Sequence, residues 1–289
     1  MQWAERCFDS LRKSTVKPDV FVVDNGSTDG TQAYIQEHYP EVKFQQSETN
    51  LGFGKANNLG LQYALDNDYN YVYLLNQDAW VMEDTFEKLI EISKKNPKYG
   101  ILSPFQMNAD LYHIDCGFIK TVLSWSSNPD ICSDMFNNHY KDIYPASSVM
   151  AAHWFITREC LMKVGGFSPS FPHYAEDYNY MDRVNYKEMQ VGIVPTLRVV
   201  HDRGWREETA EKRIYLMHMG YIRTLSNPTM SKKKGSAVVF YNALIGMLKY
   251  KSFKPIRNWM KVLSNRKAIL KNREISMNTE CAFLIPRKQ

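Results

Sequence analysis

Short apolar runs alternate along the chain with segments whose apolar residues recur at helical spacing. The runs have the length of buried strands and lie at residues 20–23, 42–44, 71–75, 100–104, 151–156, 191–194 and 199–201. The helical segments lie at residues 3–14, 56–65, 84–95, 157–164 and from 212 onward. This alternation predicts an α/β fold with a mostly parallel sheet flanked by helices and a Rossmann-like first half.

One long interval departs from the alternation. Residues 105–150 are rich in Asn, Ser and Asp, and Pro104 ends the strand expected before them. We therefore expect a weakly ordered, β-rich stretch or a lid there. The organisation that follows is an α/β domain over residues 1–206 and a helical extension over residues 207–289.

Composition narrows the class of protein. Of the 289 residues, 44% are hydrophobic and 23% are charged, which excludes a disordered chain, a collagen-like fibre and a disulfide-stapled miniprotein. The five cysteines are scattered without a CxxC pair, which favours a reducing, cytoplasmic setting. No apolar run reaches the roughly 18 residues of a membrane span, and the first residues do not resemble a signal peptide.

Charge is divided unevenly along the chain. Residues 231–289 hold 14 of the 36 Lys and Arg residues but only 2 of the 31 Asp and Glu residues. The rest of the chain is therefore acidic overall and carries a basic tail.

The first polar turn follows the run at residues 20–23 and contains Asp24, Asn25 and Asp29. Ligands of open α/β sheets bind at the carboxyl ends of strands, and the two glycines of this turn permit a close approach. These side chains therefore either contact a base or ribose, or form an Asx turn that caps a helix. The acid spacing does not fit a calcium-binding loop.

A second polar segment contains Gly52, Gly54 and Asn57. It begins like a dinucleotide fingerprint, but Asn57 replaces the third glycine and no clear strand directly precedes it, so we reject that interpretation. The segment either lines a substrate site or is a loop leading into a helix.

Two further strand ends carry candidate metal ligands. Asn76 and Asp78 follow the run at residues 71–75, and His201 ends the run at 199–201. A lone carboxylate can hold Mg²⁺ or Mn²⁺ that diphosphate oxygens and water complete, and an imidazole at a strand end can complete a metal shell or contact phosphate. The alternatives are an ordinary strand-end turn and a surface histidine.

Glu176 and Asp177 lie among aromatic residues. A carboxylate beside apolar walls can acquire the proton affinity of a general base. The alternative is a helix N-cap with a neighbouring acid at a solvated helix start.

Taken in order, these motifs resemble family-2 glycosyltransferases of the GT-A fold, in particular their rhamnosyltransferase-like branch. The matching segments are residues 24–31, 50–58 and 74–79, followed by 164–167 and by Glu176 and Asp177 with Arg183. The resemblance covers residues 1–206, which it implies form the catalytic domain. Any single motif is weak, whereas the ordered set is specific.

The resemblance implies a role for each matching position. The residues implied to contact the donor nucleotide-sugar are Asp24, Asn25, Asp29, Gly52, Gly54, Asn57 and Asn76. Asp78 and His201 would hold Mg²⁺ or Mn²⁺ at the diphosphate of a dTDP- or UDP-sugar. Asp177 would take the proton from a hydroxyl of a glycan or lipid-linked acceptor, so that transfer inverts the anomeric carbon.

The chain departs from the family pattern in two places. Asn76 stands where many relatives carry Asp, which implies weaker metal binding. Relatives also open with an apolar strand before the first helix, whereas this chain begins in that helix. We therefore expect unpaired backbone groups on neighbouring strands and low activity of the 289-residue form.

The basic tail contains an apolar helix at residues 237–250 with lysines on both sides. Such a helix is typical of a peripheral contact with the inner face of the plasma membrane. The alternative is a helical pair packed on the first domain with a solvated basic face. No nucleic-acid-binding motif is present.

A second class of function stays open at this stage. A degenerate GT-A domain could bind a nucleotide-sugar or act as a scaffold without catalysis. The single acid at residues 76–78 and the absent first strand favour that alternative.

Overall fold

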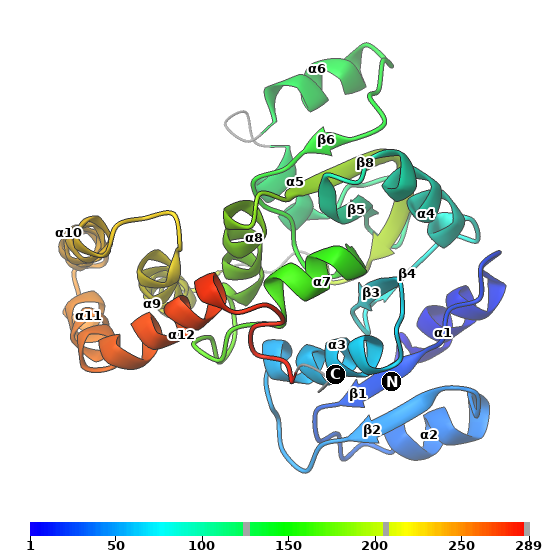
Figure 1. The fold of residues 1–289 in the computed structure, drawn as a ribbon, viewed down its shortest axis with the longest axis horizontal. Helices are drawn as coiled ribbons and strands as arrows, with labels where there is room; N and C mark the ends of the chain where they lie inside the picture. Colours follow the sequence, from blue (N-terminus) through cyan, green and yellow to red (C-terminus); the bar gives the residue numbers. More distant parts are fainter. Residues whose placement is uncertain (124–127, 205–207, 286–289) are drawn as a thin grey trace.

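Two sheets and the helices around them make up the body of the computed structural model, which describes residues 1–123, 128–204 and 208–285 (Figure 1). The smaller sheet pairs β1 (Phe21–Asp24) in parallel with β2 (Lys43–Gln46). The larger has the order β3-β7-β5-β8-β4, and β6 also pairs with β8. Its strands are β3 (Tyr71–Leu75), β4 (Ala79–Trp80), β5 (Tyr99–Met107), β6 (Tyr144–Pro145), β7 (His153–Thr157) and β8 (Gln190–His201).

Helices follow the strands as the alternation predicts. Those of the body are α1 (Ala4–Lys13), α2 (Thr31–His38), α3 (Phe53–Asp66), α4 (Thr85–Lys95), α5 (Cys116–Val122), α6 (Pro129–Phe136), α7 (Arg158–Val164) and α8 (Glu176–Tyr186). The C-terminal ones are α9 (Ala210–Ser226), α10 (Lys232–Tyr250), α11 (Lys254–Ser264) and α12 (Arg266–Asn278). The α/β class is confirmed.

The larger sheet is mixed, so the prediction of a mostly parallel sheet needs correction. β3, β5 and β8 do run in one direction, but β7 lies antiparallel between β3 and β5. β4 and β6 are antiparallel to β8. Alternating strands and helices fix the direction of strands that are neighbours in sequence, whereas β7 inserts after a long excursion of the chain.

The interval at residues 105–150 is not β-rich. It contains α5 and α6, whose Phe118, Val122 and Ile131 are at most 1% exposed. Asp115 caps α5 by accepting a hydrogen bond from the Phe118 N–H at 2.8 Å, and Pro129 occupies the first turn of α6. The frequent polar residues had masked these short apolar faces.

Strand β5 also continues through the proline that was expected to end it. A register shift in the β5–β8 ladder follows Pro104, and a proline without an N–H is tolerated at such an irregularity. β8 likewise joins the two apolar runs predicted separately at residues 191–194 and 199–201.

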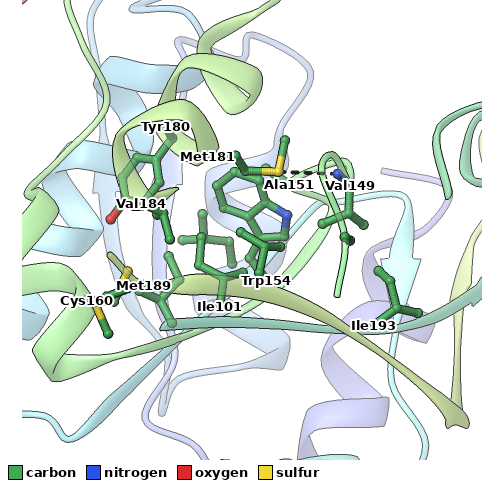
Figure 2. Close-up of a cluster of buried hydrophobic side chains, with 14 of the residues drawn as sticks. Ile101, Val149, Ala151, Trp154, Cys160, Tyr180, Met181, Val184, Met189 and Ile193 are labelled. Atoms are coloured by element: carbon green, nitrogen blue, oxygen red, sulfur yellow. Dashed lines mark hydrogen bonds between the residues drawn. The ribbon is translucent and has the colours of Figure 1, made fainter. Parts of the chain in front are cut away.

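The main core lies between the larger sheet and the helices α7 and α8. Trp154, Tyr180 and Ile101 are fully buried there (Figure 2). The Val149 N–H also donates to the Met181 sulfur at 3.3 Å, which links the segment before β7 to α8. The start of α8, which carries Glu176 and Asp177, is therefore fixed to the sheet through its own buried face.

The four C-terminal helices pack around a second apolar cluster, and α10 and α11 form one end of the molecule (Figure 1). After α12 the chain returns to the body, where the Cys281 N–H donates to the Met162 carbonyl at 2.7 Å. None of the described helices combines the length and the apolar character of a membrane span. The predicted domain boundary at residue 206 lies outside the described residues, and the division stays a prediction.

The neighbours of the expected first strand each have one ladder partner. Within the described residues, β1 pairs with β2 alone and β3 pairs with β7 alone. Each therefore has one edge without a strand beside it. The low activity expected of this form stays a prediction.

Candidate active site

The turn after β1 is held by its own side chains. Asp24 accepts hydrogen bonds from the Ser27 N–H at 2.9 Å, from the Ser27 hydroxyl at 2.5 Å and from the Gln46 amide at 3.2 Å. Asp29 accepts from the Thr31 N–H and hydroxyl and its side chain is 58% exposed. The Asx-turn interpretation therefore describes Asp24, although its turn does not cap α2, whose N-cap is Gly30.

The loop at residues 50–54 connects this turn to the start of α8. Asn25 Oδ1 accepts a hydrogen bond from the Leu51 N–H at 3.2 Å. Gly52 has φ +79°, and a Cβ there would lie 2.4 Å from the Pro172 carbonyl oxygen. A Cβ on Gly54 would lie 3.0 Å from Phe167 Cβ, so both glycines permit close packing that a side chain would prevent.

Helix α3 contributes a polar residue that the sequence interpretation missed. Asn57 donates only within its own helix, to the Phe53 carbonyl at 2.9 Å. Its neighbour Asn58 makes two hydrogen bonds to the Phe167 backbone, accepting from the N–H at 2.7 Å and donating to the carbonyl at 3.0 Å. An amide that satisfies both groups of one residue fixes the segment before α8.

The larger sheet brings Asp78 and His201 together although they are far apart in sequence. β4 pairs with the end of β8 so that Ala79 lies opposite His201. Asp78 Oδ1 lies 3.5 Å from His201 Nε2, and the two side chains are 17% and 3% exposed. His201 is therefore not the surface histidine of the alternative interpretation. Burial raises the pKa of Asp78, but the hydrogen bond and the charge of His201 outweigh it, so the pKa lies below its ordinary value.

This pair fits a divalent cation as two ligands of one ion. Ligand distances of about 2.1 Å at angles of about 90–110° separate two ligand atoms by about 3.0–3.4 Å, near the observed 3.5 Å. Within residues 1–123, 128–204 and 208–285, no group of three or more His, Cys, Asp or Glu side chains is arranged around a metal position. Other ligands would therefore come from elsewhere, such as a diphosphate and water.

A buried histidine, His153, lies next to His201. His153 Nε2 lies 2.9 Å from the Val200 carbonyl oxygen and Nδ1 lies 2.8 Å from the Tyr73 hydroxyl. Burial lowers the pKa of His153 to about 3. The neutral ring can thus donate to the carbonyl and accept from the hydroxyl, which fixes the end of β8. Its ring stands nearly perpendicular to that of His201, with centroids 6.4 Å apart.

Glu176 and Asp177 form the first turn of α8. The N-cap is Ala175, which like Tyr174 has positive φ, at 67° and 70°. Left-handed backbone at two consecutive non-glycine residues stores strain, which is common at functional sites. The N-cap alternative for the two acids is therefore wrong, and Glu176, at 5% exposed, is not solvated.

Both carboxyl groups have raised pKa values. Burial raises the pKa of Asp177 to about 6, against the opposing hydrogen bond from the Tyr178 N–H and the charges of Arg223 and Arg203. Burial, with a smaller contribution from the Asp177 charge, raises the pKa of Glu176 to about 7. A carboxylate with this proton affinity can accept a proton near neutral pH.

Arg203 is a second residue that the sequence interpretation did not single out. Its guanidinium is held by two hydrogen bonds to Asp115, at 2.9 and 3.0 Å. Its charge lowers the pKa of both Asp78 and Asp177, which places one fixed cation within electrostatic range of both. In the sequence, the signal that could have identified Arg203 is its position two residues after His201.

These contacts link most of the predicted site residues. Asn25, Gly52 and Gly54 connect the first turn to the segment before α8, and the charge of Arg203 lowers the pKa of both Asp177 and Asp78. The Asn76 N–H donates to the Ala152 carbonyl at 3.2 Å, beside Asp78. Asp29 bonds to Thr31 and lies 3.9 Å from the N-terminal amine of Met1, and Asn57 bonds to Phe53, so within the described residues no hydrogen bond joins either of them to the other site residues.

Comparisons with known proteins show which sequences and structures this chain resembles. Residues 2–115 match the model of the glycosyl transferase family 2. An N-acetylglucosaminyl-diphospho-decaprenol L-rhamnosyltransferase of Mycobacterium tuberculosis is 26% identical over 219 residues, which cover 69% of this chain and 71% of that protein. A poly-beta-1,6-N-acetyl-D-glucosamine synthase of Staphylococcus epidermidis is 33% identical over 87 residues, 29% of this chain and 20% of that protein.

Solved structures share the fold at low identity. TarS of S. aureus, residues 1–349 in complex with UDP-GlcNAc, has a TM-score of 0.56 at 14% identity and covers 96% of this chain and 80% of that one. A mannosyltransferase of Pyrobaculum calidifontis, in complex with GDP-Man and Mn²⁺, has a TM-score of 0.56 at 17% identity, covering 93% and 75%. None of these comparisons favours the non-catalytic alternative. The family match over residues 2–115, the relatives and the shared fold together support a glycosyltransferase of family 2.

Proposed function

We propose that this glycosyltransferase moves a sugar from a nucleotide-sugar donor to a hydroxyl of a glycan or lipid-linked acceptor, with inversion. The observation that carries the proposal is Asp177, a carboxyl group with a pKa of about 6 in the first turn of α8. The fixed cation Arg203 acts on this group and on Asp78 alike. A base and a diphosphate-binding carboxylate in one electrostatic neighbourhood suit displacement of a nucleotide.

The residues divide the work of the reaction. Asp177 takes the proton from the acceptor hydroxyl, whose oxygen attacks the anomeric carbon from the face opposite the nucleotide. Because no covalent sugar intermediate is needed, one carboxylate base is sufficient. Asp78 and His201 would hold a divalent cation, which supplies Lewis-acid stabilisation of the leaving diphosphate when bound. The buried His153 keeps His201 oriented.

The donor is proposed to be a dTDP- or UDP-sugar with Mg²⁺ or Mn²⁺. Support comes from the neighbours solved with UDP-GlcNAc and with GDP-Man and Mn²⁺. The residues proposed to contact the donor are Asp24, Asn25, Asp29, Gly52, Gly54, Asn57 and Asn76. Of these, Asn25, Gly52 and Gly54 have the strongest support, since they join the first turn to α8.

The product is proposed to belong to a cell-surface glycan. A rhamnosyltransferase of a diphospho-decaprenol-linked acceptor and a polysaccharide synthase are among the relatives, which supports a role in cell-surface glycan biosynthesis.

A peripheral membrane contact through α10 completes the proposal. This helix buries Gly235, Val239, Ala243 and Gly246 and exposes most of its large apolar residues. The exposed residues are Phe240 (43%), Tyr241 (63%), Leu244 (36%), Ile245 (42%) and Leu248 (72%). We name these five residues the α10 stripe. Lysines on both sides complement an anionic surface, and the cytoplasmic leaflet is anionic. Sedimentation with phosphatidylglycerol vesicles at low salt tests this contact, and an unbound protein would disprove it.

The experiment that tests the reaction is Asp177→Asn. Loss of a general base costs roughly 10²–10⁴-fold, so transfer should fall by that factor. Binding of the donor, measured as its rise of the melting temperature, should persist because Asp177 acts on the acceptor.

A matched variant controls for the removed charge. Asp182→Asn neutralises another acid of α8, which pairs with Arg223 and not with the proposed acceptor. It should retain transfer within a few-fold. Equal transfer by Asp177→Asn and the parent chain would overturn the assignment of the base.

A further inference from the structure

A cavity of about 280 Å³ lies between α9 and α11, outside the site described above. Helix α11 contributes Lys254, Arg257 and Lys261, which recur at helical spacing and therefore share one face. Helix α9 contributes Glu211 and Tyr215. The lining thus combines three cations, one acid and an aromatic ring.

The positive charge of this cavity is only partly compensated. Glu211 forms an ion pair with Lys254 at 2.6 Å. Within the part of the chain that the structure describes, neither Arg257 nor Lys261 has an ion pair. Two cations that face a cavity without a counter-charge favour an anionic ligand, and a guanidinium binds phosphate oxygens in a bidentate way.

The cavity borders the start of α8. The Tyr215 hydroxyl donates to the His173 carbonyl oxygen at 3.3 Å, and its ring meets that of Tyr174 edge-on at 6.2 Å. Burial raises the pKa of Tyr215, and the charge of Glu176 raises it further, so Glu176 lies within electrostatic range. A ligand held in the cavity would therefore lie near the segment that leads into α8.

Apolar surface adjoins the other side of the cavity. Phe253, directly before Lys254, is 80% exposed, and the α10 stripe ends nearby at Leu248. A ligand with an anionic head and an apolar tail would match both surfaces at once.

We propose that this cavity binds the phosphate or diphosphate group of an amphiphilic acceptor. Arg257 and Lys261 contact its phosphate oxygens, the tail extends over Phe253 and the α10 stripe, and the sugar hydroxyl points toward Asp177. The inference rests on the proposed function for the hydroxyl acceptor, whereas anion binding by the cavity is independent of it.

The test compares two double variants that remove the same charge. Arg257→Gln with Lys261→Gln removes the two unpaired cations of the cavity. Lys267→Gln with Lys271→Gln removes the same amount of charge from exposed positions of α12, outside the cavity. Binding of inorganic pyrophosphate is titrated in metal-free buffer. The first pair should weaken binding by about tenfold or more, since two charge-assisted contacts are lost, and the second should leave it within about twofold.

Vesicles then distinguish a lipid headgroup from a free anion. Phosphatidylcholine vesicles that contain a prenyl diphosphate should bind the parent chain more tightly than vesicles with equal charge from phosphatidylglycerol. That preference should vanish in Arg257→Gln with Lys261→Gln. Pyrophosphate binding without a preference for the prenyl diphosphate would overturn the amphiphilic acceptor.

Equal weakening by the two variant pairs, or none by either, would overturn the cavity as a site. The proposed function would survive those results, because donor-induced thermal stabilisation and the effect of Asp177→Asn do not involve α11. Failure of the proposed function would instead appear in those two measurements with pyrophosphate binding intact.

Discussion

The body and helix α10 bury different kinds of residue. In the body, Trp154 and Tyr180 are fully buried, and the acid Glu176, one helical turn before Tyr180 on α8, is 5% exposed. In α10, the buried residues are Gly235, Val239, Ala243 and Gly246, whereas Leu248 is 72% exposed. The hydrophobic effect acts on both regions, so the exposed apolar residues of α10 support the membrane contact proposed for it.

The comparison distinguishes the region proposed to carry out the reaction from the region proposed to contact the membrane. Burial in the body raises the proton affinity of Asp177, which a solvated helix would not do. Exposure in α10 leaves apolar side chains available for burial in a membrane or against another apolar surface. Full burial of each large side chain would stabilise that contact by roughly 1.5–3 kcal/mol. The following predictions test each half of this contrast.

The largest effect is expected in the body, from Asp78→Asn. Removing the carboxylate weakens the cation site, so kcat/KM should fall about 100-fold, which is about 3 kcal/mol of transition-state stabilisation. The rise in melting temperature on adding Mn²⁺ with donor should also shrink. Asp84→Asn, an exposed acid at the start of α4, should leave both values unchanged, and equal effects of the two variants would contradict the assignment.

The second effect concerns stability and the buried acid. Because the pKa of Glu176 rises from 4.5 to about 7, its contribution to stability is present below pH 4.5 and is lost as the pH rises through 7. Glu176→Gln should therefore gain stability relative to the parent chain between pH 4.5 and pH 8, by at most about 3 kcal/mol. Urea denaturation at the two pH values measures this change.

The C-terminal helices supply the control for that result. Glu274 is fully exposed, and its hydrogen bond and charge pair with Lys232 lower its pKa, which is the opposite direction. Glu274→Gln should show no gain on raising the pH. A gain as large as that of Glu176→Gln would mean that burial in the body does not explain the effect.

The third effect is the pH dependence of transfer. Asp177 must be ionised to accept a proton, so kcat/KM should rise as the pH rises through about 6 and should be about tenfold below its plateau at pH 5. Arg223 lowers this pKa, so Arg223→Gln should move the profile to higher pH while Arg223→Lys should not. A profile unchanged by Arg223→Gln would contradict Asp177 as the titrating base.

The smallest effect belongs to α10. Leu244→Gln with Leu248→Gln removes part of the α10 stripe and should weaken binding to phosphatidylglycerol vesicles by about fivefold, with little change in unfolding free energy. Ile119→Gln with Phe136→Gln, at exposed apolar positions of the body, provides the matched control. If both pairs weaken vesicle binding equally, the stripe has no special role; if the first pair dissociates a dimer, its occupant is a second copy of the chain.

Local elements were predictable because their signals are local. The apolar run at residues 71–75 coincides with β3, and the helical spacing at 84–95 marks α4 to within one residue. The prediction for residues 105–150 was wrong because α5 and α6 each bury few side chains, and a polar composition conceals a short apolar face. The prediction that the strand ends at Pro104 was wrong because the ladder with β8 has a register shift directly after Pro104.

The candidate site was predictable as a set of motifs but not as an arrangement. Asp78, Asp177 and His201 came from strand and helix ends in the sequence. The roles of Asn58 and Arg203 did not, because each depends on a partner more than 80 residues away, Phe167 and Asp115.

The sequence by itself determined the order of most strands and helices, the split between an acidic body and a basic tail, and the resemblance to family-2 glycosyltransferases. Only the tertiary structure decided that β7 runs against its neighbours and that Asp78 meets His201 across β4 and β8. It also decided which side of α10 is buried. Apolar residues occur on all sides of this helix over residues 237–248, so their spacing does not favour one face. Periodicity shows that a surface is apolar, but the close approach of neighbouring helices decides whether its small or its large residues are covered.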